Sequence, residues 1–192
     1  MAVAVAIMAL RMKSPFLVLS MVISSCAGMT GTRGEGENTM RTEVTLEPIS
    51  DGNVGAVFEL KPAPGQERFV APNPWSLAQA LAEYEISWPR AIVADGEVVG
   101  FLMLEIDPNE ENGRPFWLWR FMLGAEHQRK GYGRQALDLA CAEVRRRGGT
   151  ELYTSWVEGE GTPEPFYLAY GFEPTGEYDD GERVARLVLA SS

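Results

Sequence analysis

From residue 40 onward the chain alternates between two hydrophobic patterns. Runs with apolar residues at every second position, or with dense aromatic and β-branched residues, predict strands, and apolar residues spaced three or four apart predict helices. In chain order the patterns predict a strand over 40–48, helices over 54–60 and 77–84, strands over 89–94, 98–104 and 115–123, a helix over 133–147, a strand over 151–156, a helix over 163–170, and strands over 173–178 and 183–190. This order indicates an α+β (mixed α/β) domain in which helices pack on a mixed sheet.

Turn and cap residues sharpen the predicted boundaries. Asp95-Gly96-Glu97 and Asp179-Asp180-Gly181 each separate two β-rich runs and predict hairpin turns. Asn53 and Ser76 precede the first two helical stretches, so we expect them to be helix caps. Strict alternation over 115–123 places Trp117, Trp119 and Phe121 on one face of that strand and Phe116, Leu118, Arg120 and Met122 on the other.

The extension over 1–39 differs from the rest of the chain. Two short apolar runs, split by basic residues, precede a polar, glycine-rich linker over 30–39. Three hypotheses account for it: translation begins at Met40 and the extension is an over-called reading frame; it is a signal or lipoprotein segment with Cys26 as the lipidated residue; or it is a disordered tail. In each case we expect one domain over 40–192.

The composition excludes several classes of protein. The 192 residues include 17 basic and 27 acidic side chains, a formal net charge of −10. This charge argues against binding nucleic acid through a broad basic face and leaves room for a cationic substrate. Two cysteines, Cys26 and Cys141, cannot form a disulfide scaffold or a four-ligand zinc site. We therefore expect no nucleic-acid partner and no metal.

A glycine-containing turn joins the aromatic strand to the longest helix. Its sequence is Gln128-Arg129-Lys130-Gly131-Tyr132-Gly133-Arg134. Glycines let a backbone approach an anion closely, and the free N–H groups at a helix start face it. Of the 14 basic residues after position 39, six lie between Arg129 and Arg147, so the turn predicts a basic phosphate site in an acidic domain. It matches neither the dinucleotide fingerprint nor the Walker loop, and by itself it is equally typical of a plain strand-to-helix connection.

The turn resembles the acyl-CoA signature Q/R-x-x-G-x-G/A of the GNAT superfamily of N-acetyltransferases, and Phe166–Phe172 resembles that family's second motif, F-Y-x-x-x-G-F. The predicted element order is also that of the family. Within the superfamily the chain is most similar to bacterial spermine/spermidine (diamine) acetyltransferases, as in segments 66–71 and 119–123. Glu160 and Pro163 depart from the Asn and Ala that many relatives carry, so an Asn contact to the cofactor is not implied.

The resemblance implies a central, mostly antiparallel twisted sheet flanked by helices, with acetyl-CoA as co-substrate and no metal. It implies that the backbone of Phe121, Met122 and Leu123 pairs with the pantetheine arm. It also implies that the turn residues bind the pyrophosphate: Gln128, Arg129, Lys130, Gly131, Tyr132, Gly133 and Arg134. Tyr167 matches the tyrosine that protonates the leaving thiolate. A phenol with a pKa of about 10 is chemically suited to protonate a thiolate whose thiol has a pKa of about 8.5.

The reaction also needs a base or a water chain, because a primary amine with a Lys-like pKa of about 10.4 is protonated near neutrality. Glu105, Glu126 and His127 are the candidates. Glu105 is better explained as a solvent-facing strand end, and His127 as a solvated or capping residue. No base is assigned from the sequence.

The acceptor is expected to be a primary amine of a small molecule, with a polyamine as the narrower expectation. Residues 40–192 hold 14 basic and 25 acidic side chains, a charge of −11 that attracts cations but also serves solubility. Expected ammonium contacts are Glu83, Glu85, Glu105 and Asp107, while Trp88 and Trp119 offer cation–π contacts or buried packing. The alternatives are an aminoglycoside or protein-amine acetyltransferase, or a non-catalytic acyl-CoA-binding module. A cytoplasmic location, no membrane partner and a homodimer complete the expectations.

Overall fold

The computed structural model describes residues 43–190, so the hypotheses about the extension and Cys26 lie outside the described residues. The elements are β1 (Val44–Pro48), α1 (Val54–Glu59), α2 (Asn73–Ala82), β2 (Ser87–Ala94), β3 (Glu97–Ile106), β4 (Phe116–Leu123), the 3-10 helix η1 (Ala125–His127), α3 (Tyr132–Arg146), β5 (Glu151–Trp156), α4 (Glu164–Tyr170), β6 (Glu173–Asp179) and β7 (Glu182–Val188). The predicted order of strands and α-helices is confirmed, and η1 is an addition that the hydrophobic pattern does not show.

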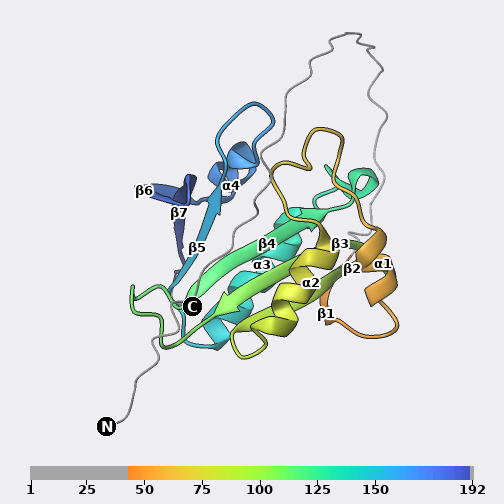
Figure 1. Cartoon of the computed structure of the whole chain (residues 1–192), viewed down its shortest axis with the longest axis horizontal. Helices are drawn as coiled ribbons and strands as arrows, with labels where there is room; N and C mark the ends of the chain where they lie inside the picture. Colours follow the sequence, from red (N-terminus) through yellow and green to blue (C-terminus); the bar gives the residue numbers. More distant parts are fainter. Residues whose placement is uncertain (1–42, 191–192) are drawn as a thin grey trace, which may run out of the picture. The chain divides into compact units, whose positions relative to one another are not determined.

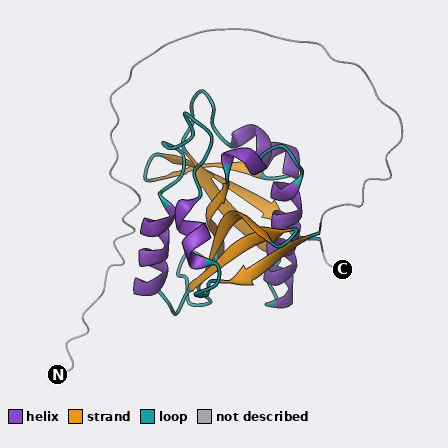
Figure 2. Ribbon diagram, turned by 90° about the vertical axis from the view of Figure 1, so that its right-hand side faces the viewer, coloured by secondary structure: helices purple, strands orange, loops and turns teal. Residues whose placement is uncertain are grey.

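Within the described residues, the strands form one sheet in the order β1-β2-β3-β4-β5-β7-β6. Every neighbouring pair is antiparallel except β4 and β5, which run parallel. Helices cover both faces (Figures 1 and 2). The main core cluster lies between the sheet and α3 and α4, and a second cluster lies under α1 and α2. The expectation of a mixed, mostly antiparallel sheet flanked by helices is confirmed.

Helix α3 follows its sequence pattern closely. The side chains that form the predicted apolar stripe are all buried against the sheet: Ala136, Leu137, Ala140, Cys141 and Val144. Arg145 and Arg146 lie in the last turn, where cations interact favourably with the helix dipole, and Gly148 follows with a φ of 83°.

No helix within residues 43–190 combines the length and the apolar composition needed to cross a bilayer.

Both predicted hairpins are confirmed, Asn53 is at the N-cap position of α1 without a side-chain capping bond, and the predicted cap at Ser76 is wrong. Asp95 and Gly96 have φ angles of 53° and 76°, as a two-residue turn requires. Asn53 immediately precedes α1, but its side chain makes no capping bond; it accepts from the Ser50 N–H and donates to the Pro48 carbonyl, and so closes the preceding turn. Helix α2 begins three residues before Ser76, because a proline near its start supplies the helical φ.

The two faces of β4 differ from the predicted alternation. The pairing with β3 shifts between Met103 and Leu104, because Trp119 is an extra residue on β4 that forms a β-bulge. Side chains after the bulge therefore change faces. Phe121 joins Phe116 and Leu118 on the face toward α3, whereas Arg120 and Met122 lie with Trp117 and Trp119 on the face toward α1 and α2. Strict alternation was the wrong expectation for this strand.

Candidate active site

Strands β4 and β5 separate near the middle of the sheet. They pair at Trp117 and Tyr153, and the Thr154 hydroxyl donates to the Leu118 carbonyl at 3.2 Å. Among the described residues, no register partner on β5 is recorded for the following segment Phe121–Leu123, and the two strands diverge (Figure 1). A strand edge without a neighbouring strand can pair with the amide groups of an extended ligand. We call this gap the β4–β5 opening.

The turn before α3 has the backbone of an anion site. Arg129 and Gly131 have positive φ angles of 62° and 86°. Left-handed residues turn successive N–H groups toward the same side, and the first N–H groups of a helix have no partner within it. Gly131 takes its angle without steric cost because it has no Cβ atom. The turn therefore presents N–H donors suited to a pyrophosphate.

Gly133 brings this turn close to the β4–β5 opening. A Cβ atom at Gly133 would lie 3.4 Å from side-chain carbons of both Leu123 and Phe166. The start of α3 consequently packs directly on β4 and α4. Phe166 also stacks on Phe121, with ring centroids 5.7 Å apart. The expected pantetheine segment and the expected pyrophosphate turn thus lie side by side, as the chemistry of a coenzyme A site requires.

The side chains of the turn have different roles. Arg129 and Lys130 are exposed and available to phosphates, whereas Arg134 lies 5.3 Å from the centre of the Tyr170 ring. Gln128 uses its amide nitrogen to bond Gln66 at 2.8 Å and the Leu123 carbonyl at 3.2 Å. Its side chain therefore ties the loop after α1 to the end of β4. Tyr132 packs against the main core.

Tyr167 is buried on α4, with 6% of its surface exposed. Its ring stacks on Trp156 at 5.4 Å and meets the edge of Phe172 at 5.4 Å. Burial raises the pKa of the Tyr167 phenol well above its ordinary value; a hydrogen bond with Thr154 lowers it in part, and the charge of Glu182 raises it further. Thr154 also bonds across to β4. The structure therefore places a protonated phenol beside the start of the opening.

The structure corrects the expectations for two candidate bases. Glu105 is buried, with 8% exposure, rather than a solvent-facing strand end. His127 is buried too, and so is not a solvated side chain; its Nε2 atom lies 3.5 Å from the exposed carboxylate of Glu126. Both His127 and Glu126 belong to η1, at the far end of β4 next to the turn.

Glu83 and Glu105, two of the four expected ammonium contacts, both act on the charge of Arg120. The guanidinium of Arg120 donates to the Trp119 carbonyl and to Gln79 of α2. Burial lowers the pKa of Arg120, and the charges of Glu182, Glu105 and Glu83 act in the opposite direction. Glu85 instead accepts from the Tyr84 hydroxyl, and Asp107 accepts from the Asn109 N–H in a loop.

Trp88 and Trp119 are half-buried and pack against the two core clusters. Trp88 packs against the main core and lies under Arg90, 3.8 Å from the ring centre. Trp119 packs against the cluster under α1 and α2, and Arg120 lies 5.2 Å from its ring. Each indole therefore already has a cation–π partner within the chain.

The structure also brings Glu182 near Ser155, Arg120 and Tyr167, which the sequence does not indicate. Glu182 begins β7, and its carboxylate accepts the Ser155 hydroxyl of β5 at 2.5 Å. Its charge affects both Tyr167 and Arg120. No sequence motif marks Glu182, because only the pairing of β7 with β5 brings it near the site.

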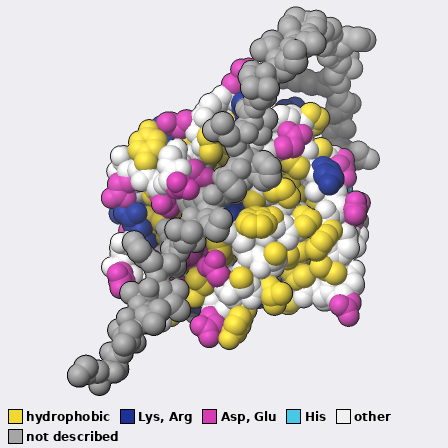
Figure 3. Space-filling view, in the orientation of Figure 1, with side chains coloured by type: hydrophobic (Ala, Val, Ile, Leu, Met, Phe, Trp, Pro, Cys, Tyr) yellow, Lys and Arg dark blue, Asp and Glu magenta, His cyan; other side chains and the backbone are white. Residues whose placement is uncertain are grey.

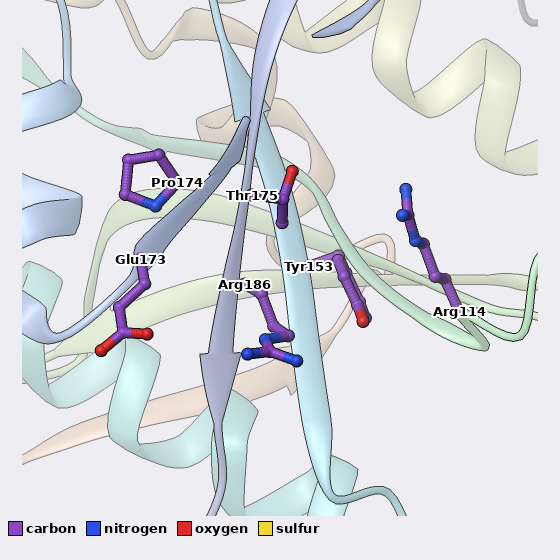
Figure 4. A pocket seen from close by; sticks show the side chains of 6 residues that line it. All are labelled: Arg114, Tyr153, Glu173, Pro174, Thr175 and Arg186. Atoms are coloured by element: carbon purple, nitrogen blue, oxygen red, sulfur yellow. The ribbon is translucent and has the colours of Figure 1, made fainter. Parts of the chain in front are cut away.

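A separate pocket lies over β5, β6 and β7 (Figure 4). It is lined by Arg114, Tyr153, Glu173, Pro174, Thr175 and Arg186. Its cations have carboxylate partners, since Arg114 bonds Glu177 at 2.5 Å and Arg186 bonds Glu151 at 3.1 Å. This pocket contains no residue of the expected site.

Within residues 43–190, no group of three or more His, Cys, Asp or Glu side chains is placed to hold a metal ion.

A sequence model of the Acetyltransferase (GNAT) family matches residues 56–172, which include the opening, the turn and Tyr167. The chain belongs to this family. It is an acetyl-CoA-dependent N-acetyltransferase, and the turn and the β4–β5 opening fit coenzyme A. No curated protein sequence matches this GNAT chain.

Solved structures show the same GNAT fold. An acetyltransferase from Thermus thermophilus is 21% identical with a TM-score of 0.61, covering 78% of this chain and 99% of its own. The PaiA N-acetyltransferase of Thermoplasma acidophilum, in complex with coenzyme A, is 16% identical with a TM-score of 0.58, covering 77% and 99%. A GNAT acetyltransferase of Elizabethkingia anophelis with acetyl-CoA bound is 16% identical with a TM-score of 0.52, covering 77% and 99%.

Proposed function

We propose that the protein transfers the acetyl group of acetyl-CoA to a primary amine of a small molecule by direct attack in a ternary complex. The observation that carries this proposal is the position of Tyr167. This buried phenol contacts Thr154 of β5, whose hydroxyl donates to β4 where the two strands begin to separate. In this proposal residues 40–192 form the catalytic domain. When bound, acetyl-CoA supplies the activated acetyl group.

In this proposal some site residues bind acetyl-CoA and Tyr167 transfers a proton. The backbone of Phe121–Leu123 holds the pantetheine arm, and the turn from Gln128 to Arg134 holds the pyrophosphate. Tyr167 protonates the departing sulfur, because its raised pKa keeps the phenol protonated at neutral pH. A water-excluding aromatic surround of Trp156 and Phe172 keeps that proton on the phenol.

A cationic acceptor, with a polyamine as the narrower class, is supported by the charges on the α1 and α2 side of the sheet. Three carboxylates, Glu83, Glu105 and Glu182, act on the single guanidinium of Arg120. Acidic side chains also border the hydrophobic surface seen in Figure 3, which shows the molecule in the orientation of Figure 1. An excess of negative charge attracts ammonium groups and raises their encounter rate.

The test is acetyl-CoA consumption over a panel of amines, with release of the CoA thiol followed in time. The panel contains spermidine, spermine, putrescine, an aminoglycoside and a peptide with a free N-terminus. The proposal predicts turnover with small amines and the highest kcat/KM for the polyamines. Faster turnover of the aminoglycoside or the peptide contradicts the polyamine class, and tight CoA binding without acetylation of any amine contradicts the enzyme assignment for these substrates.

A further inference from the structure

The contact between Ser155 and Glu182 lies beside the β4–β5 opening. Ser155 and Val184 are register partners on β5 and β7, and Val184 packs with Trp117 and Tyr153 on one face of the sheet. Side chains two residues apart on a strand share a face, so Glu182 lies on this face as well. The 2.5 Å bond from the Ser155 hydroxyl draws the Glu182 carboxylate toward β5, the strand that borders the opening.

Tyr167 approaches the opening from the opposite face of the sheet. It packs in the core cluster under α3 and α4 together with Leu152 and Trp156, whose side chains alternate with Tyr153 and Ser155 along β5. The charge of Glu182 nevertheless raises the pKa of Tyr167. The Tyr167 phenol and the Glu182 carboxylate therefore lie on opposite faces of the sheet beside the β4–β5 opening.

This arrangement suits a transfer in which the amine enters on one side and the thiol leaves on the other. Arg120 of β4 belongs to the side of Glu182, because the β-bulge turns it toward α2. The charged and titratable groups near Glu182 include Arg120 of β4, Asp179, which is its register partner on β6, and Tyr167 of α4. The candidate bases of η1 lie at the other end of β4.

We propose, on the basis of the proposed function, that Glu182 is the catalytic base that takes a proton from the acceptor ammonium, and that Ser155 is a positioning residue that holds its carboxylate. Glu182 accepts one ammonium proton and passes it to water. The neutral nitrogen then forms the C–N bond to the acetyl carbonyl carbon while the C–S bond breaks. Tyr167 gives its proton to the departing sulfur, and the second nitrogen proton restores the phenol through solvent. The products are an amide, a thiol and one released proton.

The experiment compares the wild-type chain with Glu182→Gln, which keeps the side-chain shape and an acceptor for Ser155. The acceptor is the panel amine with the highest wild-type rate, with spermidine as the first probe. The wild type reacts through the ammonium and the carboxylate, so its kcat/KM is constant from pH 7 to 9. In Glu182→Gln only free amine reacts, so kcat/KM falls at least about 100-fold at pH 7 and rises about tenfold per pH unit.

Two further variants separate the roles. Ser155→Ala retains the carboxylate, so we expect a roughly three- to tenfold loss of kcat, consistent with one lost hydrogen bond, and a pH profile that stays flat. Glu173→Gln is the matched control, an exposed carboxylate on the neighbouring strand β6, and leaves the rate and profile unchanged. The Kd of acetyl-CoA stays within about twofold in all three variants, since none touches the turn before α3.

Other outcomes overturn the assignment. A flat pH profile for Glu182→Gln, with only KM raised, shows that Glu182 binds the ammonium and is not the base. An unchanged rate removes Glu182 from the site altogether. Both results leave the proposed function intact, whereas a wild-type chain that acetylates no amine contradicts the proposed function and the role of Glu182 together.

Discussion

The ring of Tyr167 stacks on the indole of Trp156, with centroids 5.4 Å apart and planes inclined by 17°. Trp156 is itself buried, and its indole N–H has no hydrogen-bond partner among the described residues. The phenol is thus enclosed by aromatic surface rather than by cations. This explains why burial is the largest cause of its raised pKa. Such a phenol stays protonated over the whole neutral range and does not become a phenolate base.

The first prediction concerns the ionisation of Tyr167. Because its pKa is raised above the ordinary phenol value of about 10, its proton is lost only at higher pH than that of an exposed tyrosine. The difference in absorbance at 295 nm between the wild type and Tyr167→Phe, titrated from pH 7 to 11, should show no ionisation below pH 10. A titrating difference near pH 8 would contradict the burial of the phenol.

The second prediction concerns Gly131, which adopts a φ of 86° in the turn. Gly131→Ala introduces a Cβ atom into the left-handed region. It should cost about 1 kcal/mol in the free energy of unfolding and turn the N–H groups away from the proposed phosphate position. We expect the Kd of acetyl-CoA, measured by calorimetry, to rise at least about tenfold. Gly113→Ala is the control, since Gly113 has a φ of 69° in the loop before β4. Equal loss of CoA affinity in both variants would show a general effect of destabilisation.

The third prediction concerns Lys130, an exposed cation of the same turn. Lys130→Gln removes one of the charges that we propose to face the pyrophosphate, so the Kd of CoA should rise about fivefold at low salt, corresponding to about 1 kcal/mol. The effect should shrink as the salt concentration rises, because exposed charges are screened. The measurement is the Kd of CoA between 20 and about 500 mM salt. A salt-independent effect would mean that Lys130 acts through packing instead.

The fourth prediction concerns stability. Hydrogen bonds from Arg146, and then from Arg147, lower the pKa of Glu143 on α3 to about 2, from an ordinary value of 4.5. A lowered pKa means that the stabilisation is complete above about pH 4.5 and is lost as the pH falls toward about 2. Glu143→Gln should therefore lower the free energy of unfolding by about 1 kcal/mol at pH 7, a modest value because Arg146 is exposed.

Urea unfolding at pH 7 and at pH 3 checks this prediction. The difference between Glu143→Gln and the wild type should be smaller at pH 3 than at pH 7. Glu47→Gln, an exposed carboxylate on β1, should show no difference at either pH. A difference that is the same at both pH values would rule out the ion pairs as its source.

The elements could be predicted from the sequence where one local signal dominates. The stripe of Leu137 and Val144 fixes α3, and Asp95-Gly96 fixes a hairpin. The faces of β4 could not be predicted, because the bulge at Trp119 depends on the pairing with β3. In the same way Asn53 looks like a cap, yet its side chain satisfies the backbone of Ser50 and Pro48 instead.

The candidate site also contains some residues that a local motif indicates and others that only strand pairing brings together. The turn at Gly131 and Tyr167 belong to contiguous motifs, so the sequence indicates them directly. Glu105 looks solvent-facing at a strand end, but pairing with Trp117 buries it. Glu182 has no motif, and its relation to Ser155 exists only because β7 pairs with β5. Residues that act through long-range strand pairing are invisible to local patterns.

The proposed role of Tyr167 is tested most directly by the steady-state kinetics and acetyl-CoA binding of Tyr167→Phe, with the best amine of the panel as acceptor. Phenylalanine keeps the stacking on Trp156 and removes only the hydroxyl. We expect a kcat at least about 100-fold below that of the wild type, with the Kd of acetyl-CoA and the melting temperature nearly unchanged. A kcat within about threefold of the wild type would contradict the assignment of Tyr167 as the proton donor.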